Sequence, residues 1–403
     1  PLWLNPNSWG HPLCPGGTEA LGRVAGTMNP ATFDMLLKKA VPAADGKPAL
    51  LRFCVVQLPR PTPEADEVVV RVGAAPVNPS DLGGMLWGGD RLDEAYAWTN
   101  EAGLACLDVP LPDHIQIGEE SEWSGMGNEG AGIVEDAGSN AKHLLGKTVF
   151  LQGAMYAQLA KRNMSEVQVQ PEGVTVKQAA SSFVNPMTVL GMLEKMRREG
   201  HAGIVHTAAA SQLGQMLVRV CSAEGVPLVN IVRRPGQVEL LKRLGASHVV
   251  DSSAGSFRED LTRALAETGA TLAFDALGGG PVASAVLECM EHAAWFRGDK
   301  GSTYGSSVWK QLYTYGRLDS SPPELSLNYG GFRWNIGGYL VSDFLETVSE
   351  EWRASAQARI ARELSSTFRT EYGKEVSLRG LLTPENMKLA NMKGTGNKLL
   401  IVP

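Results

Sequence analysis

The chain has 403 residues and a formal net charge of −6, with 43% hydrophobic and 20% charged residues. That length is too great for one compact core and predicts two domains of a soluble, globular protein. The acidic balance argues against nucleic acid as a partner, and the lack of an apolar run near the roughly 18 residues of a membrane helix argues against a membrane.

The cysteines and histidines show no ligand or disulfide pattern. The seven histidines form no H-x-x-x-H or H-E-x-x-H cluster. The five cysteines are scattered, odd in number and without C-x-x-C spacing: Cys14, Cys54, Cys106, Cys221 and Cys289. Such cysteines are typical of reduced thiols, which predicts a cytoplasmic protein.

The first half of the chain reads as an extension followed by strands. Residues 1–27 are rich in Pro, Gly and Trp and show no period, so we expect an irregular N-terminal extension without the features of a signal peptide. From Ala49 to Pro171, apolar and polar residues alternate between turns of Pro and Gly. This alternation predicts antiparallel strands.

From Thr175 onward the apolar period becomes helical, and short apolar strands then alternate with amphipathic helices as far as residue 279. This alternation predicts parallel strands with crossover helices. A helix from Pro281 to His292 and an irregular stretch over 293–310 follow. The segment QLYTYGRL next reads as a strand, and residues 341–368 read as one long amphipathic helix.

The closing NKLLIVP reads as a strand that returns to the β-rich region. The fold class is therefore α/β, with a β-rich domain and a doubly wound parallel sheet. We expect the first in residues 28–180 and 355–403, and the second in residues 181–354.

A strand, a turn of small residues and a helix occupy Gly203 to Cys221, and the next apolar strand ends in Arg233 and Arg234. This order is typical of a dinucleotide site, and the arginines indicate a 2′-phosphate. Only the third glycine of G-x-G-x-x-G is present. The turn comprises small or helix-starting residues: Ala209, Ala210, Ser211, Gln212, Leu213 and Gly214. The alternatives are an ordinary βαβ unit and a solvated arginine pair.

Five motifs in order resemble the medium-chain dehydrogenase/reductase superfamily, in its zinc-free NADPH:quinone oxidoreductase and enoyl reductase branch. They are APVNPSDLGGM, GNEGAGIVEDAG, VNPMTVLGML, the dinucleotide turn and GNKLLIVP, within Ala49–Pro403. The resemblance implies a GroES-like β domain and a Rossmann domain with the active site in the cleft between them. It also implies NADPH as the cofactor and a homodimer.

Zinc members of the superfamily place Cys and His where this chain has Asn78 and Asn128. Amides are poor zinc ligands, so we expect no catalytic metal, and we expect Glu129 to be a structural hydrogen-bonding residue. Without a Lewis acid, hydride delivery to an electron-poor acceptor is the favoured chemistry. The expected partner is a small-molecule electron acceptor, either a quinone or an α,β-unsaturated carbonyl.

The resemblance implies that Asn78 and Asp81 lie near the nicotinamide as catalytic candidates, and that Thr188 lies near the cofactor phosphate. It also implies that Tyr315 and Gly316 face the nicotinamide. Each has an ordinary alternative, because Asn-Pro-Ser-Asp is also a favourable turn and Thr188 is also compatible with plain helix surface.

Similar enoyl thioester reductases carry a proton-donating tyrosine at a position that falls near Gly89 here. Tyr96 is the remaining candidate, provided that its loop folds back. This difference favours a quinone or a small enone over an enoyl thioester. The segment 90–123 is longer than in the family and is expected to shape specificity or an interface. A further alternative is an NADPH-binding protein without catalysis, because a fold does not secure an activity.

Overall fold

The computed structural model describes most of the chain: residues 31–86, 91–299, 301–326, 333–392 and 394–403. These residues divide into two compact units, one up to Val184 together with Ile360–Pro403 and the other over Asn185–Arg359. The extension expected over residues 1–27 lies outside the described residues. In the described part of the chain, no helix is long and apolar enough to cross a membrane.

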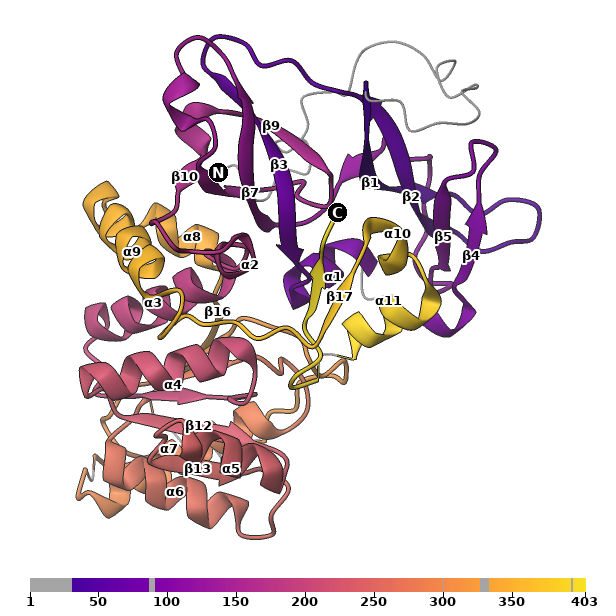
Figure 1. Cartoon of the computed structure of the whole chain (residues 1–403). Helices are drawn as coiled ribbons and strands as arrows, with labels where there is room; N and C mark the ends of the chain where they lie inside the picture. Colours follow the sequence, from indigo (N-terminus) through magenta and orange to yellow (C-terminus); the bar gives the residue numbers. More distant parts are fainter. Residues whose placement is uncertain (1–30, 87–90, 300, 327–332, 393) are drawn as a thin grey trace. The chain divides into compact units, whose positions relative to one another are not determined.

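The first unit is built on two sheets that are almost entirely antiparallel (Figure 1). Their strand orders are β4-β5-β2-β1-β6 and β10-β8-β7-β3-β18-β17, with β9 also paired to β3. The strands are β1 (Thr32–Val41), β2 (Leu50–Pro59), β3 (Glu67–Pro76), β4 (Tyr96–Thr99), β5 (Ala105–Pro110), β6 (Ser124–Gly125), β7 (Glu129–Ala137), β8 (Thr148–Gln152), β9 (Leu159–Asn163), β10 (Gln168–Val169), β17 (Lys374–Val376) and β18 (Leu399–Ile401).

Period-two patterning explains the core of this unit. Along β3, Val68, Val70 and Val72 all join the same buried cluster, as alternate residues of a strand should. Because β18 pairs with β3, the end of the chain lies in the first unit. Its helices are short: α1 (Pro79–Leu86), α2 (Val176–Ala179), α10 (Leu378–Leu381) and α11 (Pro384–Asn391).

The second unit contains a six-stranded parallel sheet in the order β13-β12-β11-β14-β15-β16. In chain order this is 3-2-1-4-5-6, the order of dinucleotide-binding sheets, and the winding direction reverses between β11 and β14. The prediction of an α/β fold with a doubly wound parallel sheet is confirmed. The strands are β11 (Ile204–His206), β12 (Leu228–Val232), β13 (His248–Asp251), β14 (Leu272–Asp275), β15 (Lys310–Thr314) and β16 (Trp334–Gly338).

Helices cover both faces of this sheet, with α3 and α4 on one side and α6 on the other in Figure 1. Val205, Ala273 and Leu312 lie in register and join a buried cluster with residues of α6 and α7. The helices are α3 (Val184–Arg198), α4 (Gln212–Glu224), α5 (Pro235–Arg243), α6 (Phe257–Thr268), α7 (Val282–Phe296), α8 (Val341–Glu346) and α9 (Glu350–Glu363).

The prediction of one long helix over 341–368 is wrong, because two helices occupy this stretch. Helix α8 ends at Glu346 and α9 begins at Glu350. The break is stabilised locally: Thr347 Oγ1 donates to the Phe344 carbonyl, and Ser349 Oγ accepts the N–H of Trp352. Ser and Thr side chains commonly compete with helical hydrogen bonds in this way.

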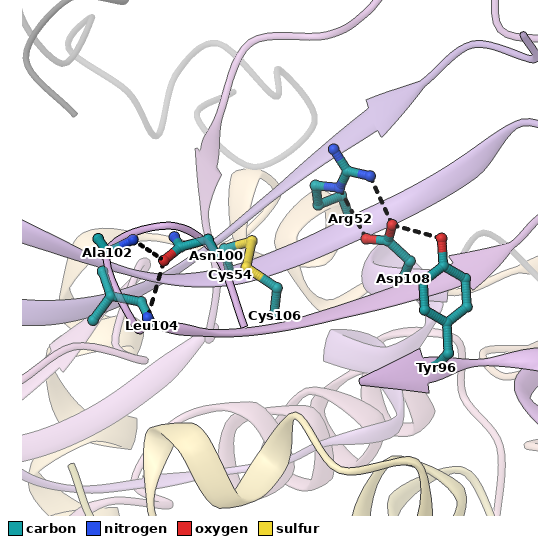
Figure 2. Close-up of a disulfide and its surroundings, with 8 residues drawn as sticks. All are labelled: Arg52, Cys54, Tyr96, Asn100, Ala102, Leu104, Cys106 and Asp108. Atoms are coloured by element: carbon teal, nitrogen blue, oxygen red, sulfur yellow. Dashed lines mark hydrogen bonds and ion pairs between the residues drawn. A yellow bond between two sulfur atoms is a disulfide. The ribbon is translucent and has the colours of Figure 1, made fainter. Parts of the chain in front are cut away.

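The prediction that all cysteines are reduced is also wrong. Cys54 on β2 and Cys106 on β5 face each other in register and form a disulfide, with their Cα atoms 4.1 Å apart (Figure 2). Sequence spacing cannot reveal this pair, because the partners are 52 residues apart and meet only when the sheet forms. Cys221 and Cys289 are buried free thiols, and Cys14 lies outside the described residues.

We expect the double variant Cys54→Ala/Cys106→Ala to lose about 4 kcal/mol of unfolding free energy, because the bond closes a loop of this length. The urea midpoint measures the loss. A phosphine reductant should lower the midpoint of the wild type and leave that of the double variant unchanged. An equal response of both proteins to the reductant would show that this bond does not stabilise the fold.

Candidate functional site

Three neighbouring strands bring a set of polar side chains together in the first unit. Asn78 follows β3, Glu129 begins β7 and Lys398 precedes β18, and these strands are adjacent in the sheet. Asn78 is fully buried. Its Nδ2 donates to Glu129 Oε1 at 3.0 Å, and its Oδ1 accepts from Lys398 Nζ at 2.8 Å. Both ends of the amide are therefore fixed by charged partners.

Asp81 holds this arrangement from helix α1. One carboxylate oxygen accepts the N–H of Asn78 at 2.7 Å, and the other accepts the N–H of Asn128 at 2.8 Å. Burial raises the pKa of Asp81 to about 6, although the two backbone N–H groups act in the opposite direction. The contacts of Asp81 thus join the start of α1 to the residue before β7.

Glu129 is a hydrogen-bonding anchor. Its second oxygen, Oε2, accepts the N–H groups of Phe183 and Val184, each at 3.0 Å. Burial raises the pKa of Glu129, while the Lys398 ammonium lowers it. Burial likewise lowers the pKa of Lys398, and the charges of Glu129 and Asp81 counter that shift. The glutamate therefore ties the sheet to the residues where α3 begins.

The donor set here does not fit zinc. The oxygen of Asn78 already accepts from an ammonium at 2.8 Å, and that positive charge would oppose a cation at the same place. Among the described residues, no group of three or more His, Cys, Asp or Glu is arranged to hold a metal ion.

The raised pKa of Asp81 predicts a pH-dependent stability. The folded state binds this proton more tightly than the unfolded state, so ionisation of Asp81 destabilises the fold. Between about pH 4 and pH 7, the wild type should lose about 3 kcal/mol of unfolding free energy relative to Asp81→Asn. Urea unfolding of both proteins across this range measures the difference. If the difference in unfolding free energy between the two proteins stayed constant with pH, the raised pKa of Asp81 would be contradicted.

The structure does not bring Tyr96 together with Asn78 and Asp81. Tyr96 lies on the edge strand β4 of the other sheet and is 48% exposed. Its hydroxyl donates to Asp108 at 3.1 Å, and Asp108 also accepts two hydrogen bonds from Arg52 (Figure 2). The long segment 90–123 thus adds β4 and β5 to this edge of the sheet.

In the second unit, the turn between β11 and α4 is compact. Ser211 caps α4, and its Oγ accepts the N–H of Gly214 at 3.1 Å. A Cβ on Gly214 would lie 2.1 Å from the Ala209 carbonyl oxygen, so only glycine permits this helix–strand contact. Ala209 and Ala210 are buried beneath the turn, and Gln212 and Leu213 begin the helix. The first N–H groups of a helix are suited to bind phosphate.

Arg233 and Arg234 lie between the end of β12 and the start of α5, next to this turn in the sheet order. Both are exposed, and neither guanidinium has an ion-pair partner in the part of the chain that the structure describes. Hydrogen bonds from Ser321 lower the pKa of Asp319, and the charge of Arg233 contributes to that shift. Because both side chains are exposed, a bound anion could reach either guanidinium, with Asp319 as a neighbouring negative charge for Arg233.

Tyr315 and Gly316 follow β15 at the same edge of the sheet. A Cβ on Gly316 would lie 2.7 Å from the Ala276 carbonyl oxygen, so the ends of β14 and β15 approach closely here. Thr188 is buried on α3. A cavity of about 580 Å³ opens at the ends of β15 and β16. Three aromatic side chains are among its lining residues, which are Lys195, Thr314, Tyr315, Gly316, Gly338, Tyr339, Leu340, Asp343, Phe344 and Thr347.

Lys398, His206 and the cavity were not predicted from the sequence. Lys398 lies within the quoted motif GNKLLIVP, but only the pairing of β18 with β3 reveals its contact with Asn78. His206 is the last residue of β11, where a single buried histidine gives no pattern.

The family described as Zinc-binding dehydrogenase matches residues 213–296. Quinone oxidoreductase 1 of Escherichia coli is 29% identical over 149 residues, which cover 36% of this chain and 44% of that protein. The mitochondrial enoyl-[acyl-carrier-protein] reductase of Homo sapiens is 28% identical over 189 residues, which cover 46% of this chain and 44% of that protein. The chain thus spans about half the length of the curated relatives it matches.

Solved structures share the fold over nearly the whole chain. The Escherichia coli quinone oxidoreductase complexed with NADPH has a TM-score of 0.61 and 17% identity, and covers 91% of this chain and 100% of its own. Etr1p in complex with NADP and crotonyl-CoA has a TM-score of 0.63 and 20% identity, and covers 92% of this chain and 100% of its own. At these identities the likeness concerns the fold.

Proposed function

We propose, from the confirmed resemblance of the chain to the quinone oxidoreductase and enoyl reductase branch of the medium-chain dehydrogenase/reductase superfamily, that it is an NADPH-dependent, zinc-independent reductase. Its acceptor is a quinone or an α,β-unsaturated carbonyl. When bound, NADPH supplies a hydride to that acceptor. The protein then has to hold the two reactants together and exclude water.

One observation carries the cofactor assignment. At the point where the strand order reverses, β11 leads into a turn whose close contact with α4 depends on Gly214. The adjacent β12 is followed by two exposed arginines that have no ion-pair partner among the described residues. This combination fits a dinucleotide with a 2′-phosphate. Residues 209–214 would hold the pyrophosphate, and Arg233 and Arg234 would hold the 2′-phosphate. Thr188 would lie near a cofactor phosphate.

The cavity beside Tyr315 supports the acceptor assignment. Its three aromatic lining residues, Tyr315, Tyr339 and Phe344, and its volume of about 580 Å³ suit a flat, conjugated molecule of modest size. We assign Tyr315 and Gly316 to the nicotinamide side of this space. In the first unit, we assign Asn78 to the reaction site and Asp81 to the positioning of Asn78 and Asn128.

Two other candidate functions predict different outcomes of the same experiment. An enoyl thioester reductase is the second candidate, because the chain shares its fold with a structure that holds crotonyl-CoA. An NADPH-binding protein without turnover is the third. We also propose a homodimer, as the resemblance implies.

The test is NADPH oxidation by the full chain, followed at the nicotinamide absorbance, with 1,4-benzoquinone, trans-2-hexenal and crotonyl-CoA. We expect turnover with the quinone or the enal and a strong preference for NADPH over NADH. Turnover with crotonyl-CoA alone would favour the enoyl thioester reductase. Tight NADPH binding without oxidation by any of the three would reject the proposed reductase activity.

A further inference from the structure

A hydrogen-bonded pair of side chains, one fully buried and one partly buried, lies at the carboxyl edge of the parallel sheet. His206 ends β11 and is fully buried, and Tyr315 follows β15 two strands away. The Nε2 atom of His206 lies 2.7 Å from the Tyr315 hydroxyl, and the two rings stack with centroids 5.8 Å apart. The hydroxyl position is therefore set by an imidazole that cannot move freely.

The other nitrogen of His206 identifies the tautomer. Nδ1 is buried and has no hydrogen-bond partner among the described residues. Burial lowers the pKa of His206 to about 3, so near neutral pH the ring is neutral and carries one proton. A proton on Nδ1 would leave a buried N–H donor without a hydrogen bond. This costs more free energy than leaving a buried acceptor nitrogen without one. The proton therefore lies on Nε2, and Nε2–H donates to the Tyr315 oxygen.

This tautomer leaves the Tyr315 proton free. The Tyr315 oxygen accepts from His206, and its hydroxyl has no second partner in the described part of the chain. Tyr315 also lines the 580 Å³ cavity, beside Gly316 and Tyr339. Burial raises the pKa of Tyr315, so the phenol stays protonated near neutral pH.

We propose that Tyr315 donates the proton that accompanies reduction of the acceptor, and that His206 is the residue that positions its hydroxyl. This inference rests on the proposed reductase function. It supplies the proton source that the sequence lacks near Gly89, which lies outside the described residues, and that Tyr96 does not offer.

The proton transfer balances with water as the final source of the proton. The Tyr315 O–H bond breaks, and its proton forms a bond to the carbonyl oxygen of the acceptor as the acceptor gains the hydride's two electrons. The phenolate left on Tyr315 accepts the hydrogen bond from His206 Nε2–H. A proton from water then restores the phenol.

The first test needs no cofactor and no activity. Nitrogen-15 NMR of the full chain reports which imidazole nitrogen carries the proton, and the His206 signals are assigned as those that shift in Tyr315→Phe. We expect the Nε2–H tautomer for His206. An Nδ1–H tautomer would overturn the inference. In that tautomer Nε2 is an acceptor, so the Tyr315 hydroxyl would donate its proton in the hydrogen bond to His206.

The second test is kinetic and has a matched control. Tyr315→Phe should lower kcat by about 100-fold or more, as loss of a general acid does, while the Kd for NADPH changes less than about twofold. Tyr313→Phe removes a hydroxyl that donates to Glu199 from the same face of β15 and should keep near wild-type kcat. Equal kcat for Tyr315→Phe and wild type would overturn the inference alone. A wild type that binds NADPH but reduces nothing would overturn the proposed function itself.

Discussion

Replacing both Arg233 and Arg234 by glutamate should weaken NADPH binding by about 100-fold or more, while NADH binding changes by less than about threefold. The side chains are exposed and unpaired among the described residues, and they follow β12, where the adenosine ribose is held in sheets of this order. Each hydrogen bond from a guanidinium to a phosphate contributes about 1.5–3 kcal/mol. Two glutamates would also repel the 2′-phosphate. Calorimetric titration with each nucleotide measures the difference.

The control for this experiment lies at the far end of helix α5, which begins directly after Arg234. Lys242 and Arg243 are exposed in the last turn of α5, and Lys242→Glu/Arg243→Glu changes the net charge by the same amount. We expect this variant to bind NADPH within about threefold of wild type, because exposed charges at that distance are screened by salt. Equal losses for NADPH and NADH in the Arg233/Arg234 variant would reject a contact with the 2′-phosphate.

Gly214→Ala should damage both stability and cofactor binding. The new Cβ would lie 2.1 Å from the backbone oxygen of Ala209, and a backbone atom cannot rotate away as a side chain can. Helix α4 would have to move away from β11. We expect a loss of about 3 kcal/mol of unfolding free energy, the upper end of overpacking costs, and NADPH binding at least about tenfold weaker.

The matched control is Gly236→Ala in helix α5. A Cβ at Gly236 meets no atom within 4 Å, and this glycine does not adopt a positive φ. Because alanine is the better helix former, we expect unchanged or slightly higher stability, by up to about 1 kcal/mol. Urea midpoints and NADPH titrations of both variants make the comparison. If Gly214→Ala and Gly236→Ala had the same urea midpoint and the same NADPH affinity, the close contact at the turn would contribute to neither stability nor cofactor binding.

Local patterns were enough to predict the fold class. The alternation of apolar residues before Pro171 and the strand–helix alternation after Thr175 predicted the β-rich region and the doubly wound sheet, and both are confirmed. The turn at 209–214 was located from the size of its residues, because small side chains are what a close helix–strand contact needs. Local competition by Ser349 and Thr347 produced the break in the helix predicted over 341–368.

Contacts between residues far apart in the sequence could not be predicted. The Cys54–Cys106 disulfide depends on β2 pairing with β5, and the bond between Lys398 and Asn78 depends on β18 pairing with β3. His206 and Tyr315 are 109 residues apart and meet through two intervening strand pairings. A single sequence does not show which strands will pair, or which residues will then face each other. The contacts of Lys398 and His206 with the predicted site residues therefore became visible only in the structure.

A crystal structure of the full chain with NADPH tests the central claim most directly. We predict that the pyrophosphate lies on the turn 209–214 and that Arg233 and Arg234 bind the 2′-phosphate. A nucleotide bound away from that turn, or a 2′-phosphate without contact to either guanidinium, would contradict the account.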